Sequence, residues 1–219
     1  MRHSASRASL SWLVTLRFTP EARIAKRKTS RQSLSYDEND FLLLLIGNDW
    51  KTKELDTLLK TIALLTDLPL RMLVVGSDEP GFYRPLVDQH ALQDRVRFEK
   101  PSMDVLSFYA AADLYVGPSL EDSFGLPILE AMACGLPVIA SANAGASEMI
   151  RDGETGIILR DPQNQLELAP VIRRIEAENP LRLSVGAAAS RYVMTNCSWD
   201  HNAEKTKRLL ESTLISLRI

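Results

Sequence analysis

The sequence is poor in the residues that build disulfide frameworks and metal centres. Its 219 residues include two cysteines, Cys134 and Cys197, and three scattered histidines. No pair among them has the spacing of metal ligands, so no metal site is expected. Two cysteines are also too few for a disulfide scaffold. The composition therefore fits a reducing compartment, and we expect a cytoplasmic protein.

Long apolar runs are missing as well. The longest uninterrupted one is Phe41–Ile46, far below the roughly 20 residues that a transmembrane helix needs. The overall composition, 45% hydrophobic and 25% charged, is that of an ordinary folded domain. A transmembrane helix is thus excluded, and any membrane contact is expected to be peripheral.

Acidic residues are scarce only near the N-terminus, in residues 1–36. Residues 1–36 carry eight Lys or Arg against one acid, whereas the rest carries 18 basic and 27 acidic side chains. The body of the protein therefore has no general attraction for nucleic acid. We interpret residues 1–40 as a basic, partly irregular leader with a remnant of an interdomain linker. Contact with an anionic membrane and a mispredicted gene start both remain open for it, and the second is favoured.

From residue 41 onward, short apolar runs alternate with helical periodicity, which is typical of repeated βα units. We predict a doubly wound, Rossmann-like α/β domain over residues 41–219, with strand order 3-2-1-4-5-6 and a helical C-terminal end. The expected strands are 41–46, 71–75, 96–99, 113–116, 138–141 and 157–159. The expected helices are 55–65, 81–92, 103–112, 126–135, 145–151, 163–178, 180–195 and 200–217. In this order strands one and four are neighbours, so the ligand is expected beyond their carboxyl ends.

The loop after the first strand is basic. It begins Gly47-Asn48 and includes Lys51 and Lys53, whose ammonium groups would suit a diphosphate. Lysines at a helix start are unfavourable for the helix dipole, which favours a functional role for at least one of them. The alternative is a solvated helix start.

The loop after the fourth strand combines an anion-binding backbone with carboxylates. Ser123 or Asp122 can cap the helix that begins near Pro127, and Gly125 lets amides approach a bound anion. Glu121, Asp122 and Glu130 would repel phosphate unless they accept hydrogen bonds from hydroxyl groups. Phosphate together with a polyol describes a nucleotide sugar. The alternatives are a simple N-cap at Asp122 and an exposed first-turn acid at Glu130.

The run from Asp122 to Ser141, DSFGLPILEAMACGLPVIAS, strongly resembles a signature of the retaining glycosyltransferase family 4 (glycosyl transferases group 1), in the C-terminal donor-binding domain of its GT-B fold. The resemblance covers residues 18–217, including the loop at 47–59 and the segments 74–77, 95–98, 108–115, 145–156 and 198–200. It implies that Asp122 faces the transferred sugar, Glu130 the ribose and Lys53 the diphosphate, and these three are the catalytic candidates. It also implies transfer from a nucleotide-diphosphate sugar without a bound metal. The donor-binding candidates are Gly47, Asn48, Lys51, Ser77, Phe98, Ser119, Glu121, Ser123, Phe124, Gly125 and Leu126.

The chain departs from this family in several ways. Asp122 stands for the usual Glu, Ser123 and Glu54 for common glycines, and Asn48 for a common Arg. The resemblance implies that a complete member also has an N-terminal acceptor domain, which we do not expect within these 219 residues. We therefore expect a donor-binding domain that works with a separate acceptor-binding domain or chain. The alternatives are a non-catalytic nucleotide-sugar-binding module and, less favoured, a related epimerase or phosphorylase.

Overall fold

The computed structural model describes residues 17–197 and 199–216. Its centre is a six-stranded parallel sheet in the order β3-β2-β1-β4-β5-β6, which confirms the predicted topology. The strands are β1 Phe41–Ile46, β2 Leu70–Val75, β3 Val96–Glu99, β4 Leu114–Gly117, β5 Val138–Ser141 and β6 Ile157–Leu159. Four of the six have the predicted bounds, whereas β2 begins one residue earlier and β4 is shifted by one residue at both ends.

Both faces of the sheet are covered by other elements, and the composition of the central strand matches this burial. In β1, Leu42 and Leu44 pack into one hydrophobic cluster, whereas Leu43 and Leu45 pack into a second cluster on the opposite face. A strand buried on both faces is apolar throughout rather than alternating, as FLLLLI is. This composition suits the central position of β1, which pairs with β2 on one side and with β4 on the other.

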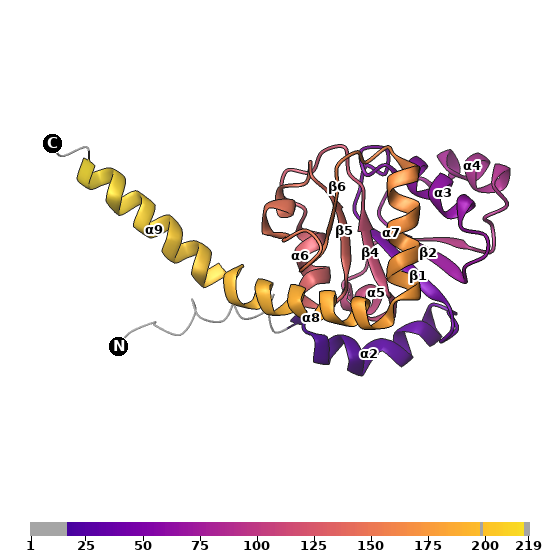
Figure 1. The fold of residues 1–219 in the computed structure, drawn as a ribbon, viewed down its shortest axis with the longest axis horizontal. Helices are drawn as coiled ribbons and strands as arrows, with labels where there is room; N and C mark the ends of the chain where they lie inside the picture. The colour runs from indigo at the N-terminus through magenta and orange to yellow at the C-terminus, as the bar shows by residue number, and fades with distance from the viewer. Residues whose placement is uncertain (1–16, 198, 217–219) are drawn as a thin grey trace.

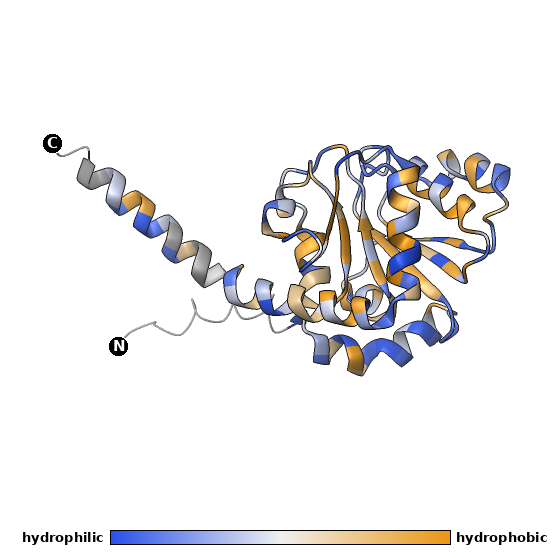
Figure 2. Cartoon of the chain, in the orientation of Figure 1, coloured by the Kyte–Doolittle hydropathy of each residue, from blue (hydrophilic) through white to orange (hydrophobic). Residues whose placement is uncertain are grey.

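Helices cover both faces of the sheet (Figure 1). One cluster joins the sheet to α2 Pro20–Ser33, α5 Leu106–Ala111, α6 Leu126–Ala133 and α8 Asn179–Asn196. The other joins it to α3 Leu55–Leu64, α4 Arg84–Gln89 and α7 Gln165–Ala177. The helix α9, Trp199–Ser216, projects away from the sheet (Figure 1). Figure 2 shows the apolar residues concentrated on the strands and on the helix sides that face them.

Three predicted helices are much shorter or of another type. The predicted helix at 103–112 is only the six-residue α5. Residues 81–92 form a 3-10 turn, Pro80–Phe82, followed by the six-residue α4. The predicted helix at 145–151 is instead a 3-10 helix, Gly145–Met149. Its start is constrained because a Cβ on Gly145 would lie 2.5 Å from the carbonyl oxygen of Ser123. This close approach to the loop after β4 leaves no room for a side chain at residue 145.

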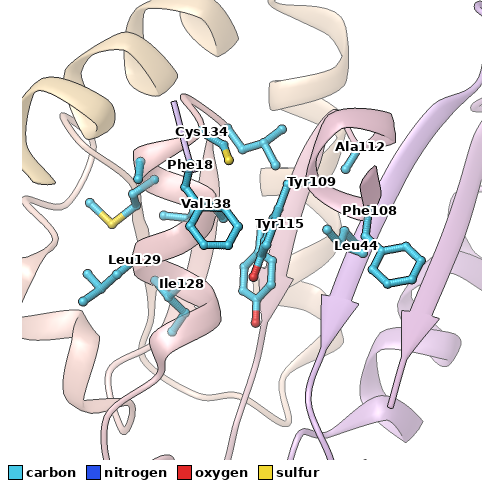
Figure 3. Packing of buried hydrophobic residues seen from close by; sticks show 14 of the residues in the cluster. Phe18, Leu44, Phe108, Tyr109, Ala112, Tyr115, Ile128, Leu129, Cys134 and Val138 are labelled. Carbon is cyan, nitrogen blue, oxygen red and sulfur yellow. The ribbon is translucent and has the colours of Figure 1, made fainter. Parts of the chain in front are cut away.

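The described part of the basic leader belongs to the fold. The helix α2 lies against α5, and Arg23, Arg27 and Arg31 on it donate hydrogen bonds to carbonyl groups at the end of α5. Cationic side chains at a helix C-terminus satisfy its free carbonyls and suit its dipole. Phe18 completes this contact, with its ring 5.6 Å from the ring of Tyr109 in an edge-on arrangement (Figure 3). Residues 1–16 of the predicted leader lie outside the described residues.

No helix within 17–197 and 199–216 has the length and apolarity needed to cross a membrane.

Candidate functional site

The loops after β1 and β4 meet beyond the carboxyl ends of these neighbouring strands. The backbone N–H of Leu120 donates to the carbonyl oxygen of Thr52 at 2.8 Å, which ties the two loops together. In a doubly wound sheet of this order, this is the place where the winding reverses and where a ligand-binding crevice forms. The two loops singled out in the sequence are therefore adjacent.

An ion pair joins the two loops at this point. The ammonium of Lys53 lies 2.5 Å from Oδ2 of Asp122, and the two side chains are 16% and 19% exposed. Both are thus largely withdrawn from water while still reachable. The pair brings together two of the three residues predicted to be catalytic.

Asp122 is held from several directions. Its Oδ1 accepts hydrogen bonds from the backbone N–H groups of Gly125 at 2.8 Å and Phe124 at 3.3 Å. Its own carbonyl oxygen accepts from the N–H of Gly145, in the loop after β5. Asp122 therefore caps the turn before α6, but the N-cap of the helix itself is Gly125 and not the predicted Ser123 or Asp122. In this state the Asp122 carboxylate occupies the backbone amides of Phe124 and Gly125, which the donor would otherwise contact.

These contacts set the charge of Asp122. Burial pushes its pKa upward, but the Lys53 ammonium and the two amides outweigh burial and hold the pKa below its ordinary value. The carboxylate is consequently ionised at neutral pH.

This lowered pKa predicts a pH-dependent contribution to stability. A depressed folded pKa stabilises the fold above the unfolded value of about 3.9, and the contribution is lost as the pH falls through the folded pKa. We expect Asp122→Asn, which keeps a capping oxygen, to unfold at lower urea than the wild type at pH 7. The difference should shrink steadily below pH 4 in urea titrations. A difference that stays constant with pH would assign the loss to something other than the ion pair.

The loop carrying Lys53 is positioned by a buried tryptophan. Trp50 is 1% exposed, its indole N–H donates to the carbonyl oxygen of Gly47 at 2.9 Å, and its ring packs on Phe98 and Tyr83. Gly47 itself has φ +150°, and a Cβ there would lie 3.0 Å from Cε of Lys53. A glycine at this position therefore lets the backbone at the end of β1 lie close to the Lys53 side chain.

Gly76, at the end of β2, gives a test of this packing. A Cβ at this position would lie 2.3 Å from the carbonyl oxygen of Gly47 and 2.5 Å from Nε1 of Trp50. We expect Gly76→Ala to lower the free energy of unfolding by about 1–3 kcal/mol, since buried backbone and indole must shift. Gly81→Ala is the matched control, because its Cβ would meet nothing within 4 Å. Thermal unfolding showing equal losses in both variants would contradict this packing.

Asn48 and Ser77, which were both predicted to bind the donor, are hydrogen-bonded to each other. The side-chain oxygen of Asn48 accepts hydrogen bonds from the backbone N–H of Ser77 at 3.0 Å and from its hydroxyl at 2.7 Å. This places Asn48 and Ser77 together at the ends of β1 and β2. Phe98 lies behind them, half-buried against Trp50, where it supports the loop rather than pointing freely to solvent.

Glu130 lies on α6, two turns after the Asp122 cap, and turns toward α5. Its Oε2 accepts a hydrogen bond of 2.7 Å from the hydroxyl of Tyr109. Burial raises the pKa of Glu130, and the Tyr109 hydrogen bond offsets this only in part. The hydroxyl donor fixes the orientation of the carboxylate.

The remaining residues predicted to bind the donor differ in how far their side chains are exposed to solvent. Ser119 is 2% exposed, whereas Phe124 is 52% and Leu126 is 45% exposed. Glu121 and Ser123 are exposed beside them. Lys51 does not join this group, because its side chain lines a different cavity together with Glu54 and residues of α3.

Sequence reasoning missed three residues that shape the site: Trp50, Tyr109 and Gly145. The signal for Gly145 was available, since the loop after β5 must adjoin the loop after β4 in the predicted order. Tyr109 carried no local signal, because its contact with Glu130 joins two different helices. Within 17–197 and 199–216, no group of three His, Cys, Asp or Glu side chains is arranged to hold a metal ion.

The sheet order and its flanking helices define the chain as a Rossmann-like domain of the GT-B type. Residues 26–192 match the sequence profile of the family described as Glycosyl transferases group 1. The match spans most of the chain, so the chain belongs to this family.

Curated relatives and solved structures agree with this assignment. The chain is 32% identical over 173 residues to the lipopolysaccharide glucosyltransferase WaaG of Escherichia coli, covering 77% of this chain and 46% of WaaG. It is 35% identical over 196 residues to the D-inositol 3-phosphate glycosyltransferase of Thermomonospora curvata, covering 83% and 44%. The chain therefore spans less than half the length of these relatives.

Two solved structures share the fold over about half of their own length. The crystal structure of WaaG gives a TM-score of 0.76 at 30% identity, covering 82% of this chain and 50% of that one. Sucrose-phosphate synthase from Thermosynechococcus elongatus gives 0.78 at 28% identity, covering 92% and 51%.

Proposed function

We propose that this chain is the donor-binding domain of a retaining, family 4 glycosyltransferase and that it binds a nucleoside-diphosphate sugar between the loops at 47–53 and 119–130. The observation that carries the proposal is the Lys53–Asp122 ion pair, which spans the two loops at the switch point. Membership of the glycosyl transferases group 1 family supports it.

In this proposal, the ion pair changes partners when the donor binds. The free protein neutralises the Lys53 ammonium with the Asp122 carboxylate. A diphosphate is the stronger anion and would take Lys53 as a charge-assisted donor. Asp122 would then be free to accept hydrogen bonds from sugar hydroxyls, while Glu130, fixed by Tyr109, would accept from the ribose.

The same groups would serve the chemical step. Transfer breaks the bond between the anomeric carbon and the diphosphate oxygen and forms one to an acceptor oxygen, whose proton is released. The negative charge that develops on the departing diphosphate would be stabilised by Lys53 and by the amides of Phe124 to Leu126. No bound metal is needed for this role, because a lysine and backbone amides supply the positive potential.

Transfer also requires an acceptor site, which we assign to a separate acceptor-binding domain or chain. The full-length relatives are more than twice as long as the matched part of this chain. A reducing, cytoplasmic setting is part of the proposal, since the described Cys134 and Cys197 are free thiols.

Isothermal titration of the chain with UDP, GDP and ADP and their glucose conjugates tests the proposal. We expect one base to bind with a one-to-one stoichiometry and the sugar conjugate to compete for the same site. Asp122→Asn should discriminate less between the conjugate and the bare diphosphate, since it loses an acceptor for sugar hydroxyls. A folded chain that binds none of the six ligands at millimolar concentration would contradict the proposal.

A further inference from the structure

A cavity lies beside the loop that carries Lys53, and both Lys51 and Glu54 line it. It has a volume of about 800 Å³ and opens between the start of α3, the 3-10 turn at Pro80–Phe82 and the segment before α7. Neither Lys53 nor Asp122 belongs to its wall. The wall consists of Lys51, Glu54, Asp56, Thr57, Lys60, Asp78, Glu79, Phe82, Tyr83, Gln163 and Gln165.

Part of this wall is rigidly built. Glu54 is 7% exposed, and its two carboxylate oxygens accept hydrogen bonds from Thr57 at 2.6 Å and from the Gln163 amide at 3.0 Å. Since Gln163 precedes α7 and Thr57 lies on α3, Glu54 joins both sides of the cavity. Tyr83, 9% exposed, packs edge-on against the buried Trp50 and anchors the third side. The cavity is thus shaped by fixed groups.

Other polar groups of the wall are available to a ligand. Within the described part of the chain, five of these side chains form no hydrogen bond or ion pair with other residues: Lys51, Asp56, Lys60, Glu79 and Gln165. They offer ammonium and amide donors beside carboxylate acceptors. A ligand that both donates and accepts many hydrogen bonds fits this mixture.

The aromatic ring of Phe82 adds a flat apolar surface. It is 85% exposed and lies in the wall of the cavity, so its face is accessible to a ligand there. The apolar C–H face of a pyranose ring can stack on such a ring while its hydroxyls reach polar groups. Pockets that bind small molecules combine an apolar surface with a few placed polar groups in this way.

The charged residues of the cavity wall limit the chemical classes of ligand that can bind there. Four carboxylates stand against two lysines, so a nucleotide or another phosphate ester would be repelled. A purely apolar ligand would leave these charged groups desolvated. We infer that this cavity binds a neutral oligosaccharide, stacked on Phe82 and hydrogen-bonded to Lys51, Glu79 and Gln165. This inference does not depend on the proposed donor site.

Amide NMR titration of the full chain with maltotriose, cellotriose and chitotriose tests the inference. We expect at least one of them to shift the signals of Phe82, Gln163 and Lys51 in a saturable way. Phe82→Ala should weaken that binding about fivefold, the value of one aromatic contact. Met103→Ala, which removes an exposed apolar side chain outside the cavity, should leave it unchanged.

Three results would overturn the inference. The first is no saturable shift with any of the trisaccharides at 20 mM. The second is binding that Phe82→Ala and Met103→Ala leave equally strong. The third is a set of shifts confined to the loops around Lys53 and Asp122, which would place the sugar in the donor crevice instead. A parallel titration with UDP, GDP and ADP reports on the donor crevice separately.

Discussion

Replacing Asp113 by alanine is expected to lower the free energy of unfolding by about 3–5 kcal/mol, the cost of breaking a buried ion pair. The carboxylate of Asp113 lies 2.6 Å from both Arg27 and Arg31 and accepts the backbone N–H of Leu42 at 2.8 Å. Arg31 is only 1% exposed. Removing the carboxylate leaves this guanidinium buried without its counter-charge, and frees an amide at the start of the central strand.

Urea denaturation at neutral pH measures this loss. Asp67→Ala is the matched control, because Asp67 also forms a two-contact ion pair with an arginine, Arg173, but at the surface. Exposed pairs contribute little, so the control should lose only a small fraction of what Asp113→Ala loses. Comparable losses in the two variants would show that α2 is not bound to the sheet through Asp113.

The second large effect concerns ligand affinity. We expect Lys53→Ala to weaken binding of the preferred nucleoside diphosphate by about 30-fold or more, as truncating a partly buried charge that pairs with an anion typically does. The variant also leaves Asp122 ionised in the crevice without its partner, which adds repulsion toward the diphosphate. Isothermal titration of wild type and variant measures the ratio.

Two other lysines make this prediction specific. Lys28→Ala removes an exposed lysine of α2, and affinity should not change. Lys51→Ala removes a charge two residues from Lys53, yet its side chain lines the other cavity, so we expect a change of less than about threefold. A loss in Lys51→Ala as large as in Lys53→Ala would mean that both lysines reach the diphosphate, as the sequence alone suggested.

The sheet could be predicted because its signals are local. Most strands are short apolar runs, although β3 (VRFE) alternates apolar and charged residues, and the order follows from right-handed crossovers. That order makes β1 and β4 neighbours, which predicts that the loops carrying Lys53 and Asp122 lie side by side. The helix at 55–65 was equally clear, since Leu55, Leu58, Leu59 and Ile62 share its buried face.

What the sequence could not predict depends on contacts between distant segments. Residues 20–33 read as part of a basic leader because the partners of Arg27 and Arg31 lie more than 80 residues away. Lys51 and Lys53 line different sites, and no local signal distinguishes them. Glu54, which follows them, has a left-handed φ of 54°, which is uncommon for a residue with a side chain. Gln163 and Thr57 stabilise Glu54 there, and neither contact has a local signal.

The central claim is that the crevice between the loops at 47–53 and 119–130 holds the diphosphate of a nucleotide sugar. A crystal structure of the chain with the nucleoside diphosphate selected by titration tests it most directly. We predict a diphosphate oxygen within hydrogen-bond distance of Nζ of Lys53 and an Asp122 carboxylate that no longer pairs with this lysine. A diphosphate bound elsewhere, with the Lys53–Asp122 pair intact, would contradict the account.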